Sequence, residues 1–265
     1  MVLRTGRAEN ERGLVYPDKD QQIENQSTLA SKRIVLLGGS SGIGLAVAQQ
    51  VLAQGAHAII ASSNQERLQQ AADSLGGDAE GRRLDLSDES SIELFFQELG
   101  AFDHLVYTAG DTLQLDELAA MDLKKARGAF ELRFWSAVAA VKYASPHIRE
   151  GGSIVLTTGV AGLRPRKGWV VAASGCGAIV SLTRALAVEL APIRVNAVSP
   201  GVVRTNLWQN MMEQDRNSMY ENVRKTLLVG HVGEPAEIAR AYVFLMQEGY
   251  STGQVVVVDG GAVLV

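Results

Sequence analysis

The chain has 265 residues, of which 46% are hydrophobic and 20% charged, a composition typical of a globular protein with a large apolar core. Its net charge of −4 and isoelectric point of about 5.6 exclude the strongly basic surface that binds nucleic acid or anionic membranes. The single cysteine excludes an intrachain disulfide framework and indicates a reducing, cytoplasmic compartment, and the four scattered histidines have no spacing typical of a metal site.

The first segment, residues 1–30, is a polar arm without the apolar stretch of a secretory signal. No part of the chain reaches the continuous apolar length of a membrane span, so we expect no membrane partner. The polarity of residues 1–25 predicts a segment that is disordered or lies on the surface. Residues 31–265 are expected to form one domain, because no break in composition divides them.

From residue 32 onward, short apolar runs alternate with helical patterns. Helices are predicted over 43–52, 125–143 and 178–190. The apolar runs predict strands at 33–37, 57–61, 105–107, 153–156, 194–198 and 254–258. Continuous apolar strands that alternate with helices are typical of a parallel sheet covered on both faces. We therefore expect an α/β fold with a Rossmann-type, doubly wound parallel sheet of about seven strands.

The first predicted strand leads into a glycine-rich loop over 38–44, Gly-Gly-Ser-Ser-Gly-Ile-Gly, where the first helix begins. Glycine permits a sharp turn and lets backbone N–H groups approach a pyrophosphate at the positive end of a helix. Glycines also suit tight turns for steric reasons alone, but the order of strand, loop and helix is the context that a dinucleotide site requires. The loop therefore predicts a dinucleotide-binding site.

Further motifs accompany this loop. They are the pair Asp85-Leu86, and the pair Ala109-Gly110 shortly after a predicted strand. Together with the loop they resemble the short-chain dehydrogenase/reductase superfamily over roughly residues 30–265. In that family the first pair holds the adenine ring. The second closes an N-N-A-G motif, in which Tyr107 and Thr108 here replace the asparagines.

Residues 194–201 and 257–261 are similar to the late motifs of the same family, and 200–205 resembles the segment whose threonine holds the nicotinamide carboxamide. The alternative is that Pro200-Gly201 is only a turn after a strand. The resemblance implies the following cofactor contacts: Gly38, Ser40, Ser41, Ile43, Asp85, Leu86, Ala109, Gly110, Pro200, Gly201, Val203 and Thr205.

The end of the second predicted strand indicates which nicotinamide cofactor binds. A site for NAD places a carboxylate there for the ribose 2′-hydroxyl. This chain has Ser62, Ser63 and Asn64 instead, with Arg67 one helical turn further on. Hydroxyl and amide donors suit a 2′-phosphate, so we expect NADP(H) rather than NAD(H). The same three residues are also a typical helix cap, and the two interpretations are compatible.

The residues that usually catalyse the family's reaction are replaced. The resemblance places Ala172 where the family has its tyrosine, Cys176 where it has lysine and Gly159 where it has serine. Arg133 stands in the place of the asparagine. In the family the tyrosine protonates the carbonyl oxygen and the lysine lowers the tyrosine pKa. An ordinary alcohol dehydrogenase is therefore not expected.

Three residues are candidates to act in this pocket instead. Arg133 could bind a carbonyl or amide oxygen, Asp111 could pair with a cationic substrate, and Trp169 could stack on an aromatic ligand. The alternatives are a structural ion pair between Arg133 and Asp111, and a core position for Trp169. The cations at 164–167 are interpreted mainly as a solvated loop, and Cys176 as a small core residue.

A fungal branch of the superfamily, the bifunctional reductase/Diels–Alderases of indole alkaloid pathways, has the same pattern of losses, with arginine in the asparagine place. Gly168 stands where that branch has a carboxylate. We expect an NADP(H)-dependent reductase of specialised metabolism that acts on a small imine, iminium or conjugated substrate, and the resemblance suggests the steering of a following Diels–Alder-type cyclisation as a further activity. The alternatives are a non-redox cyclase or lyase and a catalytically dead NADP(H)-binding scaffold or sensor.

Two predicted helical segments, 119–143 and 178–190, are apolar over much of their surface. One helix cannot bury all its faces against one sheet, so a second copy of the chain is the expected partner. Members of the family commonly pair these two helices. We therefore expect a homodimer or homotetramer.

Overall fold

The computed structural model describes residues 8–9, 15–16, 28–110, 113 and 115–265. In the expected N-terminal arm, β1 (Ala8–Glu9) pairs antiparallel with β2 (Val15–Tyr16). The rest of the arm up to residue 27 lies outside the described residues. Leu29, near the end of the arm, is 1% exposed and packs in the core of the domain that follows.

The domain contains a seven-stranded parallel sheet with the strand order β5-β4-β3-β6-β7-β8-β9, which confirms the doubly wound α/β fold. The chain starts in the middle at β3, runs out to one edge and returns beside β3 to build the other half. The order therefore reverses between β3 and β6, where ligands bind in such sheets. The strands are β3 (Arg33–Leu37), β4 (His57–Ser62), β5 (Ala79–Arg83), β6 (Phe102–Tyr107), β7 (Ile148–Thr157), β8 (Arg194–Pro200) and β9 (Val255–Val258).

The edge strand β5 was not among the strands expected from apolar runs. Its sequence is Ala-Glu-Gly-Arg-Arg, and its side chains are exposed or half-buried. It pairs with β4 alone, so one edge and much of its surface face solvent. A strand that is not buried on both faces needs no continuous apolar run, which is why that criterion missed it.

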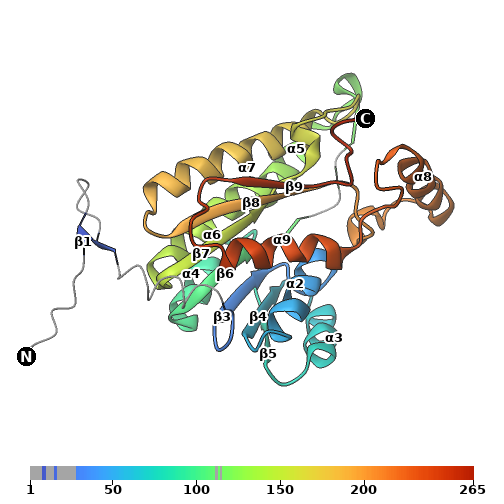
Figure 1. Cartoon of the computed structure of the whole chain (residues 1–265). Helices are drawn as coiled ribbons and strands as arrows, with labels where there is room; N and C mark the ends of the chain where they lie inside the picture. The colour runs from blue at the N-terminus through green and yellow to red at the C-terminus, as the bar shows by residue number, and fades with distance from the viewer. Residues whose placement is uncertain (1–7, 10–14, 17–27, 111–112, 114) are drawn as a thin grey trace, which may run out of the picture.

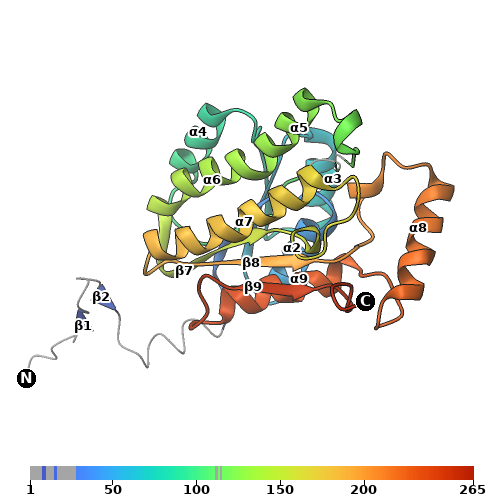
Figure 2. The same ribbon diagram turned by 90° about the horizontal axis from the view of Figure 1, so that it is seen from above.

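Helices cover both faces of the sheet (Figures 1 and 2). Strand residues alternate between the two layers, so that Ile34 and Leu36 pack on one side while Val35 and Leu37 pack on the other. One face carries α2 (Gly42–Leu52), α3 (Gln65–Leu75) and α9 (Pro235–Gln247), and the other carries α4 (Glu89–Leu99), α6 (Ser136–Ala144) and α7 (Val170–Glu189). Figure 1 shows α8 (Glu213–Thr226) standing apart from these layers.

The helix expected over 125–143 is interrupted. It consists of α5 (Leu123–Phe130), a π-helical turn η2 (Glu131–Trp135) and then α6. The backbone N–H of Ser136 donates to the carbonyl of Glu131, five residues back instead of four. The expected helical segment is therefore present, and the sequence did not indicate the π turn at its centre, where Arg133 lies.

Helix α7 has the length and apolar composition of a membrane-crossing helix, but a core helix of a globular protein passes the same test. Here its buried residues, among them Ile179, Thr183 and Ala187, pack with the sheet layer. Much of its remaining surface is exposed, as with Val188 at 74%. The helix begins at Val170, earlier than the expected residue 178. Its outer face includes exposed apolar side chains such as Val170 and Val188.

Candidate active site

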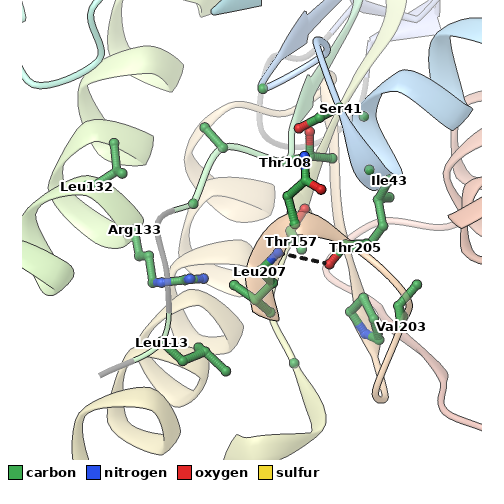
Figure 3. Close-up of a pocket in the computed structure, with 18 of the residues that line it drawn as sticks. Ser41, Ile43, Thr108, Leu113, Leu132, Arg133, Thr157, Val203, Thr205 and Leu207 are labelled. Atoms are coloured by element: carbon green, nitrogen blue, oxygen red, sulfur yellow. Dashed lines mark hydrogen bonds between the residues drawn. The ribbon is translucent and has the colours of Figure 1, made fainter. Parts of the chain in front are cut away.

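A cavity of about 520 Å³ opens at the carboxyl ends of the central strands, where the strand order reverses (Figure 3). Loops that follow β3, β4, β6, β7 and β8 contribute to its wall, together with η2 and the start of α7. Parallel strands place their carboxyl ends at one edge, so motifs from distant parts of the chain meet here. The cavity is therefore the candidate site predicted from the sequence.

Glycines form the cradle at one side of the cavity. Gly38 has a φ of +89°, and a Cβ on it would lie 2.6 Å from the backbone nitrogen of Ala109. A Cβ on Gly44 would lie 2.4 Å from the carbonyl oxygen of Gly38. Ser41, the N-cap of α2, makes no side-chain cap hydrogen bond, so the first helical turn can offer N–H groups to an anion. The cradle fits the pyrophosphate of a dinucleotide.

The adenosine end of the cavity contains Asp85, Leu86 and the serines at the end of β4. Asp85 accepts hydrogen bonds from the Ser87 hydroxyl at 2.7 Å and the Ser87 backbone N–H at 2.9 Å, and these bonds lower the pKa of the carboxyl. Its position beside the cavity and its fixed geometry suit the edge of an adenine ring. The residues here support the adenine contact implied by the family motif.

The residues expected to choose the cofactor divide into two groups. Ser62, Ser63 and Arg67 line the cavity. Asn64 is not among the lining residues: its side chain accepts the backbone N–H of Arg67 at 2.8 Å and caps α3. Of the two interpretations given above, helix capping therefore applies to Asn64. The Nε atom of Arg67 is buried and has no hydrogen-bond partner among the described residues.

The nicotinamide end is built from the segment after β8. Pro200, Gly201, Val203 and Thr205 all line the cavity, as expected. The Thr205 hydroxyl accepts the backbone N–H of Leu207 at 3.3 Å (Figure 3), and the buried indole of Trp208 donates to the carbonyl of Val203 at 3.0 Å. These bonds fold the segment into a rigid wall.

The three positions where the family has tyrosine, lysine and serine also line the cavity, and they carry Ala172, Cys176 and Gly159. A Cβ on Gly159 would lie 3.3 Å from the Cys176 sulfur, so the thiol stands beside the vacated serine place. Burial raises the pKa of the thiol, against the opposing effects of a Thr158 hydrogen bond and the Arg133 charge. Among the described lining residues there is no tyrosine, lysine or histidine.

Arg133 projects from η2 into the cavity in Figure 3. Its Nη1 atom lies 3.0 Å from the point where a Cβ of Gly110 would be, so the absence of a side chain there makes room for the guanidinium. Trp169, the N-cap of α7, lines the cavity and has the Arg166 guanidinium 5.5 Å from its ring centroid. Asp111, the third candidate, lies outside the described residues.

The other cations of the 163–169 loop have structural contacts. Arg164 donates to the carbonyl of Ala262 at 2.9 Å, and Lys167 forms an ion pair with Glu117 at 2.7 Å. Neither lines the cavity. The interpretation of these cations as part of a surface loop therefore agrees with the structure. In the described part of the chain, no group of three or more His, Cys, Asp or Glu side chains is arranged for a metal ion.

Several lining residues were not expected from the sequence, among them Leu113, Leu132 and Trp208. Tyr107, directly behind the cavity, was noted only as a departure from the family motif. Its hydroxyl donates to the carbonyl of Leu132 at 2.7 Å. No motif marks these residues, because their places depend on where α8 and η2 pack and not on local spacing. The replacement of asparagine at Tyr107 was the one available signal.

Known proteins are similar to this chain in sequence and in structure. A family model described as enoyl-(acyl carrier protein) reductase matches residues 38–263. Short-chain dehydrogenase/reductase ATR9 of Stachybotrys chlorohalonatus is 36% identical over 252 residues, which cover 89% of this chain and 99% of that protein.

Two solved structures are similar along their whole length. A small-chain dehydrogenase in complex with NADPH has a TM-score of 0.79 and 39% identity, covering 89% of this chain and all of its own (100%). The MalC reductase/Diels–Alderase of Malbranchea aurantiaca has a TM-score of 0.84 and 30% identity, covering 91% of this chain and 99% of its own.

Proposed function

Because the chain belongs to the short-chain dehydrogenase/reductase family, we propose that it is an NADP(H)-dependent reductase of specialised metabolism that works without the family's tyrosine. Its small-molecule substrate is an imine, an iminium ion or a conjugated carbonyl compound. The observation that carries this proposal is that one and the same cavity contains the glycine cradle for a dinucleotide and, at the places where the family has its catalytic residues, Ala172, Cys176 and Gly159. NADPH, when bound, supplies a hydride to an electrophilic carbon.

The groups in the substrate half favour these substrates over simple ketones. Adding a hydride to a ketone makes an alkoxide, which needs a proton donor or an oxyanion site. Tyrosine, lysine and histidine are missing from the described cavity lining, and burial holds the Cys176 pKa above its ordinary value. An iminium carbon that gains a hydride yields a neutral amine, so no proton has to be delivered. A conjugated carbonyl yields an enolate, a far weaker base than an alkoxide, whose oxygen a cation can stabilise until solvent water supplies the proton to carbon.

Arg133 is the residue assigned to that oxygen. A guanidinium offers several N–H donors in a fixed plane and keeps its charge at all physiological pH values. The described apolar wall beside it includes Leu113, Leu207 and Trp208. An apolar wall strengthens a charge-assisted contact once the substrate displaces water from it. Trp169 offers an aromatic face for a ring of the substrate.

A cyclisation after reduction is a second candidate activity, favoured by the similarity to the MalC reductase/Diels–Alderase. Gly168 stands where the related fungal enzymes have a carboxylate, and its φ of +82° is suited to glycine. Any cyclisation in this chain would therefore depend on the shape of the apolar wall and on Arg133. Asp111 remains a proposed partner for a cationic substrate.

The proposal is tested by NADPH oxidation with a panel of cyclic iminium ions, enones and simple ketones. We expect turnover of an iminium ion or an enone and none of the ketones. Turnover of simple ketones at comparable rates would contradict the substrate class. A protein that binds NADPH but turns over no member of a broad panel would instead support the scaffold or sensor alternative.

Replacing Arg133 by alanine tests its role in that reaction. Turnover should fall tenfold or more, because a charge-assisted contact contributes roughly 1.5–3 kcal/mol. NADPH affinity should stay unchanged, since the cradle lies elsewhere in the cavity. A lower melting temperature with full activity per folded molecule would remove Arg133 from the catalytic residues.

A further inference from the structure

We infer that Tyr107 is a positioning residue, whose hydroxyl holds the π-helical turn Glu131–Trp135 in place and thereby directs Arg133 into the cavity. The inference rests on the proposed function, since Arg133 is the group that Tyr107 positions. It assigns a role to a residue that does not line the cavity and that the family motif would make asparagine.

The first observation is a bond across the fold. Tyr107 is the last residue of β6 and is only 2% exposed. Its hydroxyl donates to the carbonyl of Leu132 at 2.7 Å, 25 residues further along the chain. Burial raises the pKa of the phenol, so Tyr107 keeps its proton and remains a donor. A shorter side chain at this place would not span the gap between β6 and η2 in the same way.

The second observation explains why this carbonyl needs a donor. In a regular α-helix the carbonyl of Leu132 would accept the backbone N–H of Ser136. Here that N–H is bonded to Glu131, and the Ser136 hydroxyl also donates to the Glu131 carbonyl at 3.2 Å. The π turn thus releases the Leu132 carbonyl, and Tyr107 satisfies it. A half-buried carbonyl left without a donor is unfavourable, which would favour a different turn.

The third observation connects the turn to the cavity. Arg133 follows Leu132 directly, so the bond from Tyr107 fixes the backbone from which the Arg133 side chain starts. The far end of that side chain lies against Gly110, where guanidinium atoms stand 3.0–3.3 Å from the place of a Cβ. Tyr107 and Gly110 belong to the same strand exit. One short segment therefore bonds the turn from which Arg133 starts and leaves room for its guanidinium.

The chain contains a built-in reporter for the position of Arg133. Cys176 is the single cysteine, and it lines the same cavity. Burial raises the pKa of its thiol. The Thr158 hydrogen bond, the charge of Arg133 and the Gly162 backbone N–H lower it. If the guanidinium moves away, the pKa of Cys176 rises. The pH midpoint of thiol alkylation measures this change without cofactor or substrate, because the thiolate is the reacting form.

The experiment compares iodoacetamide alkylation of the full-length protein and of its Tyr107→Phe variant across the alkaline pH range. We expect the midpoint to rise in Tyr107→Phe toward that of Arg133→Met. Alkylation at a fixed pH below the midpoint should slow about threefold or more, since each unit of pKa changes the thiolate fraction tenfold. Tyr143→Phe is the matched control: it removes an exposed hydroxyl bonded to Glu89 and should leave the midpoint unchanged.

Ser136→Ala removes a hydroxyl that donates to the Glu131 carbonyl of the same turn and provides a second variant if Tyr107→Phe does not fold; its midpoint should rise in the same direction. A midpoint that stays native in Tyr107→Phe while Arg133→Met shifts it would overturn the inference, whatever happens to the melting temperature. An unshifted midpoint in Arg133→Met would also overturn it. Neither result depends on NADPH or a substrate, so failure of the proposed reaction is distinguishable from failure of this inference.

Discussion

Arg67 lies at the end of the cavity where the ribose 2′ position of a bound dinucleotide belongs, beside Ser62 and Ser63. Its backbone is held by the Asn64 cap, and its Nε is buried without a partner among the described residues. Replacing Arg67 by methionine keeps the apolar stem and removes the charge. We predict that this change weakens NADPH binding and leaves NADH binding nearly unchanged, because only NADPH carries the 2′-phosphate.

The expected size of the effect follows from the kind of contact. A hydrogen bond between charged groups contributes roughly 1.5–3 kcal/mol. Arg67 is half-buried, so solvent screens part of this interaction. At about 1.4 kcal/mol per factor of ten, the dissociation constant for NADPH should rise about ten- to a hundredfold.

Isothermal titration of the free protein with each nucleotide measures the effect directly. Arg224→Met is the matched control, because Arg224 pairs with Glu221 on α8 and does not line the cavity. An equal loss for NADPH and NADH would show that Arg67 supports the adenosine pocket in general. Tighter binding of NADH than NADPH by the native protein would refute the cofactor preference itself.

Two further predictions concern stability and assembly. Burial, followed by the charge of Arg194, lowers the pKa of His104 to about 3, so the unfolded chain binds a proton below about pH 6.5 that the folded chain does not. The free energy of unfolding should therefore fall by up to roughly 1.4 kcal/mol for each unit by which the pH is lowered from about 6.5 toward 3. His104→Gln should remove this pH dependence, as measured by urea titrations at neutral and acidic pH. Val188 on the outer face of α7 and Trp135 on η2 are 74% and 55% exposed, so light scattering should give a dimer or tetramer that Val188→Asp dissociates, whereas a monomeric native protein would contradict the assembly.

The parts of the fold that the sequence predicted are those in which local pattern and tertiary position agree. Five of the six expected strands lie inside the sheet and are mostly buried, so they can be apolar along much of their length, and the sixth, the edge strand β9, is a run of four valines. The strand β5 was missed because an edge strand has no such demand. The π turn at Glu131–Trp135 was missed for another reason: its hydrogen-bond register depends on a tyrosine from β6, which helical spacing cannot reveal.

The cofactor half of the site was predictable because a few backbone positions determine it. Gly38 and Gly44 tolerate no side chain, since a Cβ on either would collide with backbone atoms. Such constraints leave a fixed spacing of glycines that can be recognised in one sequence. Asn64 shows the limit of this approach, because the same residue types serve as a helix cap and as phosphate donors, and only the structure distinguishes the two.

The substrate half of the cavity is determined by side chains and not by backbone positions, so its chemistry can change while the fold stays the same. Ala172, Cys176 and Arg133 reach the cavity as side chains on helical segments whose backbone course does not depend on them. Replacing such side chains leaves the sheet, the glycine cradle and the dinucleotide contacts intact. The overall likeness to relatives therefore reports on the cofactor far more directly than on the reaction. The substrate has to match Arg133, which stands on the turn bonded by Tyr107 with its guanidinium beside Gly110, and the apolar wall of the cavity.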